Sequence, residues 1–220
     1  MKKISKFISE TEKSEILSFV NTLHADLDIT NKHVGQVASN LNGLSYMFDI
    51  TKSERSSTLS KFQSSDNLMQ CHLPEIFLTL LDRISNRLKI KKSDVFLQII
   101  DQKSGGLIYP HYDSAIDGFI TYKANISVLS EDYQLMLGDD VLDISESDLY
   151  SFEASLYKHW TLPFTKRRVI LSFGFILPYK DLGRNEDDKR VRLSKRIIKY
   201  FQNIRSSQLK SRKAIKNYKY

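Results

Sequence analysis

The stretch Gly105-Gly-Leu-Ile-Tyr-Pro-His-Tyr-Asp-Ser114 combines a glycine pair, a short apolar run and a His-x-Asp triplet. This pattern predicts a short strand over residues 107–111. In an extended strand, residues i and i+2 project from the same face, so His111 and Asp113 can point into the same space. One imidazole and one carboxylate are two thirds of the 2-His-1-carboxylate site that suits non-haem Fe(II). A surface strand with a polar end is the alternative explanation of the triplet.

A third candidate ligand, His159, lies 48 residues after His111, in a predicted strand over residues 158–162. In a jelly roll, strands that are distant in sequence become neighbours across the barrel, so ligands on two such strands can meet. A surface or capping histidine beside Trp160 is the other interpretation. Together with His111 and Asp113, His159 would complete three ligands for a metal ion.

Two arginines, Arg167 and Arg168, stand at the start of an otherwise apolar strand predicted over residues 168–176. Strand alternation puts Arg168 and Ser172 on one face and Arg167 on the other. A guanidinium that points into a barrel needs an anion, because an unpaired buried charge is costly. Arg168 with Ser172 therefore predicts a seat for a carboxylate, which the fork of the guanidinium can bind through both oxygens. Arg167 would then face outward.

From residue 93 onward the sequence has the pattern of short strands separated by glycine, aspartate and proline. Eight strands are predicted, over residues 95–101, 107–111, 122–129, 133–137, 141–144, 149–153, 158–162 and 168–176. The segment Gly138-Asp-Asp140 predicts a hairpin turn between the fourth and fifth of them. Because no helix fits between the strands, the predicted fold class is mainly β with flanking helices, built on a double-stranded β-helix, a jelly-roll or cupin-like core.

Two amphipathic helices are predicted before these strands, because apolar residues recur at helical spacing over residues 9–28 and 74–88. Ser9 or Thr11 is the expected cap of the first helix, and Pro74 opens the second. Both helices are expected to pack on one face of the sheet. The segment between them predicts a strand over residues 43–50 and a long loop over residues 53–67.

The predicted organisation is one domain with an appendage. Residues 1–183 form the single domain, with the N-terminal helices in residues 1–92 and the jelly-roll core in residues 93–178. Residues 184–220 form a basic C-terminal helix and tail, in which the helix is expected over residues 187–204.

The charge of the chain is divided unevenly. The whole chain has a net charge of +7, but residues 184–220 carry 13 Lys and Arg against 3 Asp and Glu, which leaves the body mildly acidic. The basic pI is therefore no argument that the body binds nucleic acid. Cys71 is the single cysteine, so no intramolecular disulfide can form, and no apolar run reaches the roughly 18 residues of a membrane helix. These features predict a cytoplasmic protein.

Taken together, the motifs resemble those of the Fe(II)/2-oxoglutarate-dependent oxygenases. The resemblance covers residues 95–177 and consists of the strand order, His111-x-Asp113, His159 and an arginine nine residues later. The surrounding residues are most similar to the prolyl hydroxylase-like and the aspartyl/asparaginyl hydroxylase-like branches. Asp113 departs from the halogenase variants, which have a small residue there, and from aspartyl hydroxylases, which lack the carboxylate ligand. The gap from His159 to Arg168 is about one residue shorter than in many relatives, which keeps Arg167 open as the anchor.

The resemblance implies three cofactors or co-substrates: Fe(II), 2-oxoglutarate and O2. His111, Asp113 and His159 would be the metal ligands, and no catalytic residue beyond them is implied. The far carboxylate of 2-oxoglutarate would pair with an arginine helped by nearby polar groups. The residues expected to contact the co-substrate or the substrate are Arg168, Ser172, Tyr109, Asn125 and Gln98.

The implied reaction is hydroxylation of an unactivated C–H group with release of succinate and CO2. The expected substrate is a small molecule, an amino acid or a peptidyl residue, chosen by the loops over residues 29–70, 114–121 and 144–148. Two alternatives stay open: an oxygenase that acts on protein or nucleic acid, and a non-catalytic jelly-roll binding protein. Nucleic acid is not favoured because the body is acidic, and the sequence indicates neither a membrane partner nor an oligomeric state.

Overall fold

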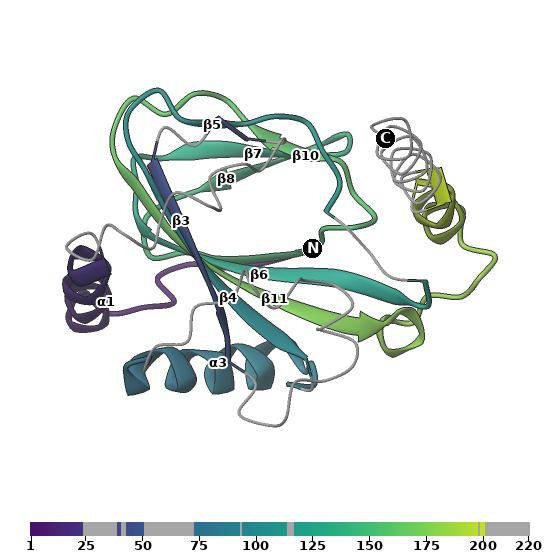
Figure 1. Ribbon diagram of the computed structural model, residues 1–220, viewed down its shortest axis with the longest axis horizontal. Coiled ribbons are helices and arrows are strands. Elements are labelled where there is room, and N and C mark those ends of the chain that lie inside the picture. The colour runs from purple at the N-terminus through teal and green to yellow at the C-terminus, as the bar shows by residue number, and fades with distance from the viewer. Residues whose placement is uncertain are drawn as a thin grey trace, which may run out of the picture.

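A computed structural model gives the fold of the chain (Figure 1). It describes residues 1–23, 39–40, 43–50, 73–92, 94–113, 117–197 and 199–200. Within these ranges strands predominate, and they form a larger and a smaller sheet that face each other, with helices outside (Figure 1). This arrangement is a mainly β jelly roll with flanking helices, which confirms the predicted fold class.

The larger sheet contains six antiparallel strands in the order β1-β9-β6-β11-β4-β3. Their bounds are β1 (Lys2–Ile4), β3 (Gly43–Asp49), β4 (Val95–Gln102), β6 (Phe119–Leu129), β9 (Leu149–Glu153) and β11 (Arg168–Pro178). The long strand β11 lies between β6 and β4 and pairs with both along most of its length. It therefore forms the centre of the sheet, and its two faces decide what lies on either side.

The smaller sheet has the order β10-β7-β8, and a two-stranded pair joins β2 to β5. Their bounds are β2 (Ser39–Asn40), β5 (Leu107–Ile108), β7 (Tyr133–Leu137), β8 (Asp140–Ile144) and β10 (His159–Thr161). β7 and β8 form the predicted hairpin, in which Leu137 pairs with Asp140 across a two-residue turn. Gly138 has a φ of +63° at this turn, which is a conformation that glycine adopts without strain.

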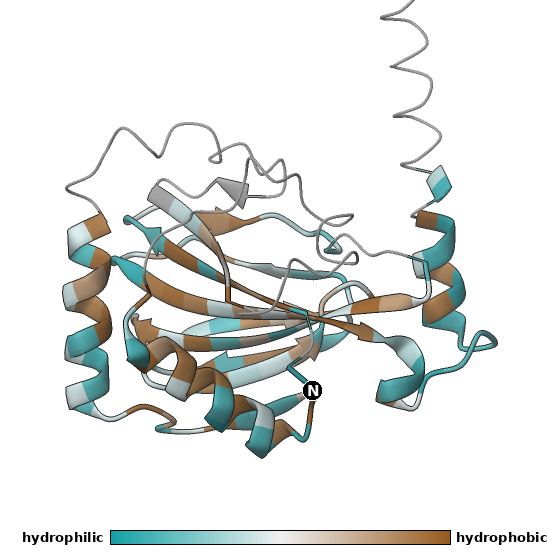
Figure 2. Ribbon diagram, turned by 60° about the horizontal axis from the view of Figure 1, so that its bottom comes forward, coloured by the Kyte–Doolittle hydropathy of each residue, from teal (hydrophilic) through white to brown (hydrophobic). Residues whose placement is uncertain are grey.

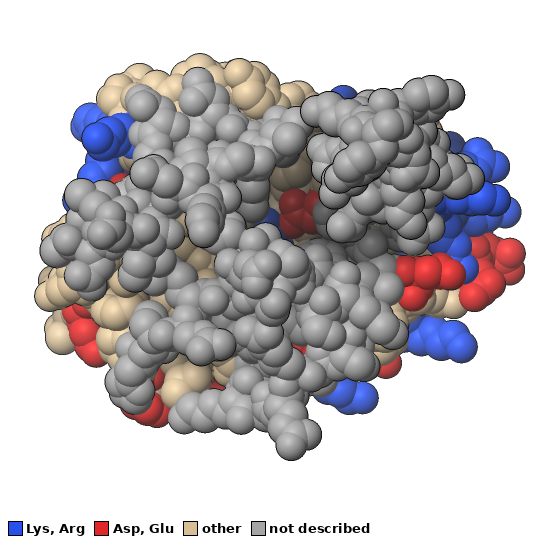
Figure 3. Space-filling view, in the orientation of Figure 1, with Lys and Arg blue, Asp and Glu red and all other residues tan. Residues whose placement is uncertain are grey.

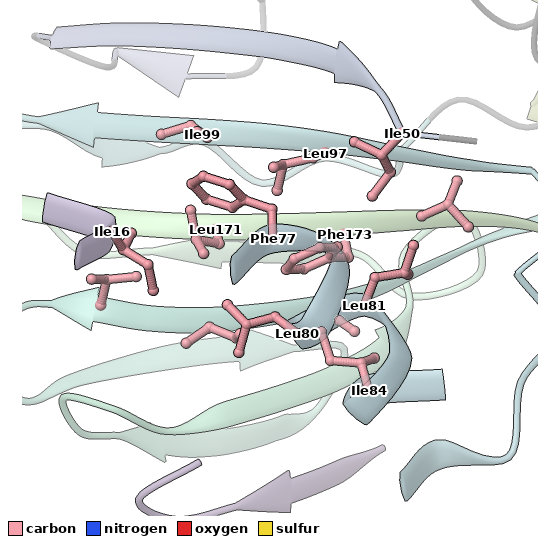
Figure 4. Close-up of a cluster of buried hydrophobic side chains, with 14 of the residues drawn as sticks. Ile16, Ile50, Phe77, Leu80, Leu81, Ile84, Leu97, Ile99, Leu171 and Phe173 are labelled. Carbon is pink, nitrogen blue, oxygen red and sulfur yellow. The ribbon is translucent and has the colours of Figure 1, made fainter. Parts of the chain in front are cut away.

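The hydrophobic core lies between the larger sheet and two helices, α1 (Glu10–Leu23) and α3 (Glu75–Leu88). Brown apolar and teal polar segments alternate along both helices in Figure 2, as expected for helices that cover a sheet. Figure 4 shows side chains from α3 meeting side chains from the sheet. Among the residues labelled there are Phe77, Leu80, Leu81 and Ile84 from α3, Leu97 and Ile99 from β4, and Leu171 and Phe173 from β11.

The helix termini match the sequence in most details. Ser9 caps α1 in a capping box, because the Glu12 backbone N–H donates to Ser9 Oγ at 3.2 Å and the Ser9 N–H donates to Glu12 Oε2 at 2.9 Å. Arg83 of α3 forms an ion pair with Glu12, which joins the two helices. Pro74 is the N-cap of α3, whereas the predicted range had it as the first residue of the helix.

After β11 the chain forms the 3-10 helix η3 (Tyr179–Leu182) and then a helix over residues 189–197. Val191 of that helix is buried in a small cluster with Ile120, Leu156 and Tyr179. Figure 3 shows blue and red side chains next to each other at the right-hand edge of the view, where this helix lies. The apolar side of the helix thus packs on the body, and charged groups stand around it.

The structure differs from the predicted elements in several places, and β6, for example, begins at Phe119 instead of residue 122. β5 ends at Ile108 instead of residue 111, because His111 leaves the strand and forms an isolated bridge with His159. β1 and β2 were not predicted, since two or three residues are too few for a visible alternation. The end of the first predicted helix, the loop over residues 53–67 and the chain beyond residue 200 lie outside the described residues. No helix within the described ranges combines the length and apolar character needed to cross a membrane.

Candidate metal centre

The three predicted ligands, His111, Asp113 and His159, come together at one end of the barrel. The backbone N–H of His111 donates to the carbonyl of His159 at 3.2 Å, and the reverse bond is 2.9 Å long. This bridge holds the two imidazole rings with their centroids 4.2 Å apart. One potential ligand atom from each of the three residues lies within 4.8 Å of the others, which is the spacing of a group that could hold a metal ion.

The tautomer of both histidines is fixed by backbone carbonyls. His111 Nδ1 is 2.8 Å from the carbonyl of Tyr109, and His159 Nδ1 is 3.0 Å from the carbonyl of Tyr157. Because a carbonyl only accepts hydrogen bonds, each Nδ1 carries a proton, and Nε2 is then the ring nitrogen that can bind a metal. Metal-binding histidines are commonly oriented in this way.

The two Nε2 atoms point at the same carboxylate oxygen. Asp113 Oδ1 lies 3.2 Å from Nε2 of His111 and 3.7 Å from Nε2 of His159. A metal ion between these atoms would be held by two imidazole nitrogens and one carboxylate oxygen. The donor set of two imidazole nitrogens and one carboxylate oxygen therefore fits Fe(II) bound on one face.

His159 is suited to metal binding by its surroundings. It is 4% exposed and packs edge-on against the ring of Phe152, with the centroids 4.9 Å apart. Burial lowers the pKa of His159 to about 4, because the charged imidazolium would lose its hydration. At neutral pH the ring is therefore uncharged and its Nε2 lone pair is free to bind a metal.

Asp113 is held from two further directions. Its backbone N–H donates to the carbonyl of Ala154 at 3.0 Å, and its Oδ2 forms an ion pair with Nζ of Lys123 at 2.9 Å. Burial by itself would raise the pKa of Asp113, but the Lys123 ammonium and the neighbouring His111 hold that pKa well below its usual range. Asp113 is therefore a carboxylate at neutral pH.

A cavity opens beside these ligands, between the two sheets. Its volume is about 50 Å³, which is room for a few water molecules. The larger sheet forms its floor, and β10 and β7 of the smaller sheet contribute to the opposite wall. The polar residues that line it are Gln98, His111, Lys123, Asn125, Tyr150, His159, Arg168 and Ser172.

Arg168 lines this cavity, and the residue as a whole is only 2% exposed. Its Nε and Nη1 atoms have no hydrogen-bond partner among the described residues, and no acidic side chain in that part of the chain pairs with it. Two rings hold the guanidinium in place: its Cζ lies 4.4 Å from the centroid of Tyr133 and 4.1 Å from that of Phe164. A buried, positioned cation with free donors is a site for an anion.

Arg167 lies on the opposite face of β11 and does not reach the cavity. Its Nε and Nη2 atoms donate to the two carboxylate oxygens of Asp101 at 3.0 and 2.7 Å. Nη2 also donates to Oδ1 of Asn21 in α1. Of the two arginines, Arg168 lines the cavity together with His111 and His159, and Arg167 is not among its lining residues.

Other polar groups around the cavity also have unused hydrogen-bonding capacity. Ser172 Oγ and Asn125 Oδ1, both of residues that line the cavity, are buried without a partner among the described residues. Ser172 is flanked by Gln98 on β4 and Asn125 on β6, since these are its partners in the two registers. Gln98 is satisfied by Ser45 at 2.9 Å. Buried polar atoms are normally paired, so Ser172 and Asn125 can offer hydrogen bonds to a polar ligand in the cavity.

The structure corrects one predicted residue and adds another. Tyr109 does not line the cavity: its side chain is 48% exposed, because β5 ends before it and the chain turns outward. Lys123 was not predicted, although it lines the cavity and touches Asp113. The sequence could have indicated Lys123, because it lies two residues before Asn125 and therefore on the same face of the strand.

Comparison with known proteins gives matches at the level of structure only. No protein-family model matches the sequence, and no curated protein is significantly similar to it. A prolyl-4-hydroxylase from Pseudomonas putida superposes with a TM-score of 0.56 and 14% identity, over 80% of this chain and 91% of the other. A prolyl hydroxylase from Trichoplax adhaerens, solved with a hypoxia inducible factor peptide fragment, gives 0.53 and 11%, over 84% and 87%. OsALKBH1 gives 0.54 and 13%, over 78% and 96%.

At these identities the matches establish the fold, and the arrangement of His111, Asp113 and His159 fits it. Prolyl hydroxylases and the AlkB homologue are Fe(II)/2-oxoglutarate-dependent oxygenases, the group that the sequence motifs resemble. The chain therefore shares the jelly-roll fold of the Fe(II)/2-oxoglutarate-dependent oxygenases and carries a His-Asp-His group that fits their metal site.

Proposed function

We propose that the protein is an Fe(II)- and 2-oxoglutarate-dependent dioxygenase that hydroxylates an unactivated C–H group and releases succinate and CO2. One observation carries the proposal: His111 and His159, which group with Asp113 as potential metal ligands, line the same cavity as Arg168, whose Nε and Nη1 have no partner among the described residues. A protein that only bound a metal would have no use for a buried anion site beside it. The alternative of a non-catalytic jelly-roll binding protein does not account for Arg168.

In this proposal His111, Asp113 and His159 hold Fe(II) through two Nε2 atoms and one carboxylate oxygen. When bound, the metal would supply the oxidising chemistry that 2-oxoglutarate and O2 drive in such enzymes. The protein's part is to fix the ligand geometry. The carbonyls of Tyr109 and Tyr157 orient the two rings, and burial keeps His159 neutral and ready to bind.

Arg168 is the proposed seat of the far carboxylate of 2-oxoglutarate. Its free Nε and Nη1 donors can bind a carboxylate in a forked geometry, and the nearby hydroxyl of Ser172 can donate a further hydrogen bond. Asn125, next to Ser172 across the strands, is placed to contact the bound acid. The aromatic rings of Tyr133 and Phe164 exclude water from the guanidinium, which strengthens its attraction for an anion.

The proposed substrate is an amino acid, free or within a peptide. Two of the structural neighbours are prolyl hydroxylases, and one of these was solved with a peptide, which supports this class. Action on a whole protein or on nucleic acid is the alternative, and the acidic charge of residues 1–183 makes nucleic acid the weaker of the two. We also place the protein in the cytoplasm, with its single cysteine as support.

The first experiment is anaerobic addition of Fe(II) and 2-oxoglutarate to the full chain. We expect a weak visible charge-transfer band, which reports 2-oxoglutarate bound directly to Fe(II). Amino acids and peptides are then screened in air for stimulated succinate release. A folded, metal-loaded protein that shows no band would refute the role of 2-oxoglutarate. If the band appears but no tested substrate stimulates succinate release, the proposed substrate class would be wrong.

A further inference from the structure

We infer that Lys123 is a positioning residue that makes Asp113 a ligand through one oxygen only. This inference rests on the proposed metal site and concerns how the carboxylate is oriented in it. The two oxygens of Asp113 face different partners: Oδ1 faces Nε2 of both histidines, and Oδ2 lies 2.9 Å from Nζ of Lys123. The Lys123 ammonium thus pairs with Oδ2, the oxygen of Asp113 that does not face the two histidines.

The surroundings of Lys123 make this contact specific. Its side chain and that of Asp113 are each 14% exposed, so the pair is largely removed from water. Among the described residues, Asp113 is the acidic partner of this ammonium. Breaking such a pair leaves an uncompensated buried charge, which is far more costly than losing a surface ion pair.

The position of Lys123 in the sheet explains why a lysine can lie here. In the register of β6, Lys123 is opposite Gly174 on β11 and Phe152 on β9. Gly174 has no side chain to compete for space, and a Cβ atom at that position would collide with the ring of Phe96. Lys123 can therefore extend along the floor of the cavity toward Asp113, on the same face as Asn125.

The orientation of the carboxylate matters for the number of open metal positions. A carboxylate that binds through both oxygens takes two positions of an octahedral metal, whereas binding through one leaves three positions for 2-oxoglutarate and O2. Because Lys123 holds Oδ2, Asp113 would bind the metal through Oδ1 alone. Loss of a residue that orients a metal ligand in this way typically lowers metal affinity by about 10–100-fold.

The test compares Lys123→Met, Lys123→Arg and Lys158→Met in the full chain, loaded anaerobically with Co(II). Lys158 is exposed and adjacent to His159, so its variant removes the same charge near the site without touching Asp113. We expect K123M to weaken Co(II) binding by about 10–100-fold and to lower the intensity of the visible Co(II) bands as the second oxygen coordinates. K123R and K158M should keep the wild-type spectrum and bind within a few-fold of wild type.

Two results would overturn the inference alone: K123M with wild-type affinity and spectrum, or K123M with tighter binding, which would show that the ammonium opposes the metal. Absence of Co(II) binding by the wild-type chain would instead overturn the proposed function and this inference with it. Thermal melting separates binding from folding. If K123M does not fold, Lys123→Gln takes its place in the test, because glutamine is neutral but keeps a polar end group. The expected results are the same.

Discussion

At the scale of single residues, Arg168 shows a conflict between stability and binding. A buried donor without a partner costs about 1–3 kcal/mol, and more when it is charged. Arg168 has two such donors in a residue that is 2% exposed. The stacking on Tyr133 and Phe164 offsets part of this cost. Groups that destabilise the free protein in this way are common where a ligand binds.

This conflict predicts opposite effects of Arg168→Met on stability and on binding. The variant should raise the unfolding free energy of the ligand-free protein by about 1–3 kcal/mol, because the unpaired donors are gone. It should weaken 2-oxoglutarate binding at least about tenfold, because a charge-assisted carboxylate contact is lost, and leave metal affinity unchanged. Denaturant unfolding and calorimetric titration of the metal-loaded protein measure the two effects.

The matched control is Arg167→Met, one residue away on the other face. It should keep 2-oxoglutarate affinity but lose stability, since Asp101 would be left buried without its forked partner. If Arg168→Met bound 2-oxoglutarate like wild type, the assignment of the anchor would be wrong. If Arg167→Met lost that affinity instead, the anchor would lie on the other face.

The residues of the site differ in how far the sequence could predict them. The face that carries Arg168 and Ser172 followed from strand alternation, because β11 is long and regular. Tyr109 was misplaced because alternation was extended beyond the end of β5. Lys123 was missed because a lysine in a strand is normally solvated, and its partner comes from a distant segment. Contacts across the barrel depend on closure, which no local pattern contains.

At the scale of elements, the two helices show how a local motif and a tertiary contact share one residue. Glu12 closes the capping box of α1 and also forms the ion pair with Arg83 of α3. Burial alone would raise the pKa of Glu12, but the hydrogen bonds and charge of Arg83, with the N–H of Ser9, lower it below its ordinary value. A carboxyl with a lowered folded pKa stabilises the protein above its unfolded pKa of about 4.3 and loses this effect as the pH falls.

We therefore predict that Glu12→Gln destabilises the protein by about 1 kcal/mol at pH 7, because glutamine keeps the capping box but not the ion pair. The difference from wild type should be complete above the unfolded pKa of about 4.3 and should shrink as the pH falls from there through the lowered pKa of folded Glu12. Urea unfolding at a series of pH values measures it. Glu15→Gln is the control, since Glu15 is exposed on the same helix. A difference that stayed constant to pH 3 would contradict the ion-pair explanation.

The longer elements were mostly predictable, although β6 begins at Phe119 instead of residue 122. β7 and β9 have the predicted bounds, and β11 begins at the predicted residue, because alternation or an apolar run over five or more residues is a clear signal. β1 adds only three residues at the edge of the larger sheet, paired with β9. Such a strand exists because an unpaired edge is available to it, which is a property of the sheet and not of the segment Lys2–Ile4.

At the scale of the whole molecule, the larger sheet separates folding from chemistry. One face of β11 presents Val169, Leu171 and Phe173 to the helices and the hydrophobic core. The other face presents Arg168 and Ser172 to the cavity. One face of β11 therefore belongs to the hydrophobic core and the other lines the cavity, so adjacent residues in this strand have different roles.

This separation predicts that two adjacent substitutions in β11 act on different properties. Leu171→Ala removes a fully buried side chain and should lower the unfolding free energy by about 2–5 kcal/mol, while the folded fraction keeps its affinity for 2-oxoglutarate. Ser172→Ala removes a hydroxyl that has no partner among the described residues, so stability should stay within about 0.5 kcal/mol of wild type. Its loss should weaken 2-oxoglutarate binding by about 2–10-fold.

Denaturant unfolding and titration of the metal-loaded protein with 2-oxoglutarate, at a temperature where both variants are folded, give the four values. Equal losses of affinity in both variants would mean that the two faces of the sheet are coupled. Separate effects would show that the cavity face of β11 was free to carry polar, individually destabilising groups because the opposite face supplies the packing that holds the strand in place.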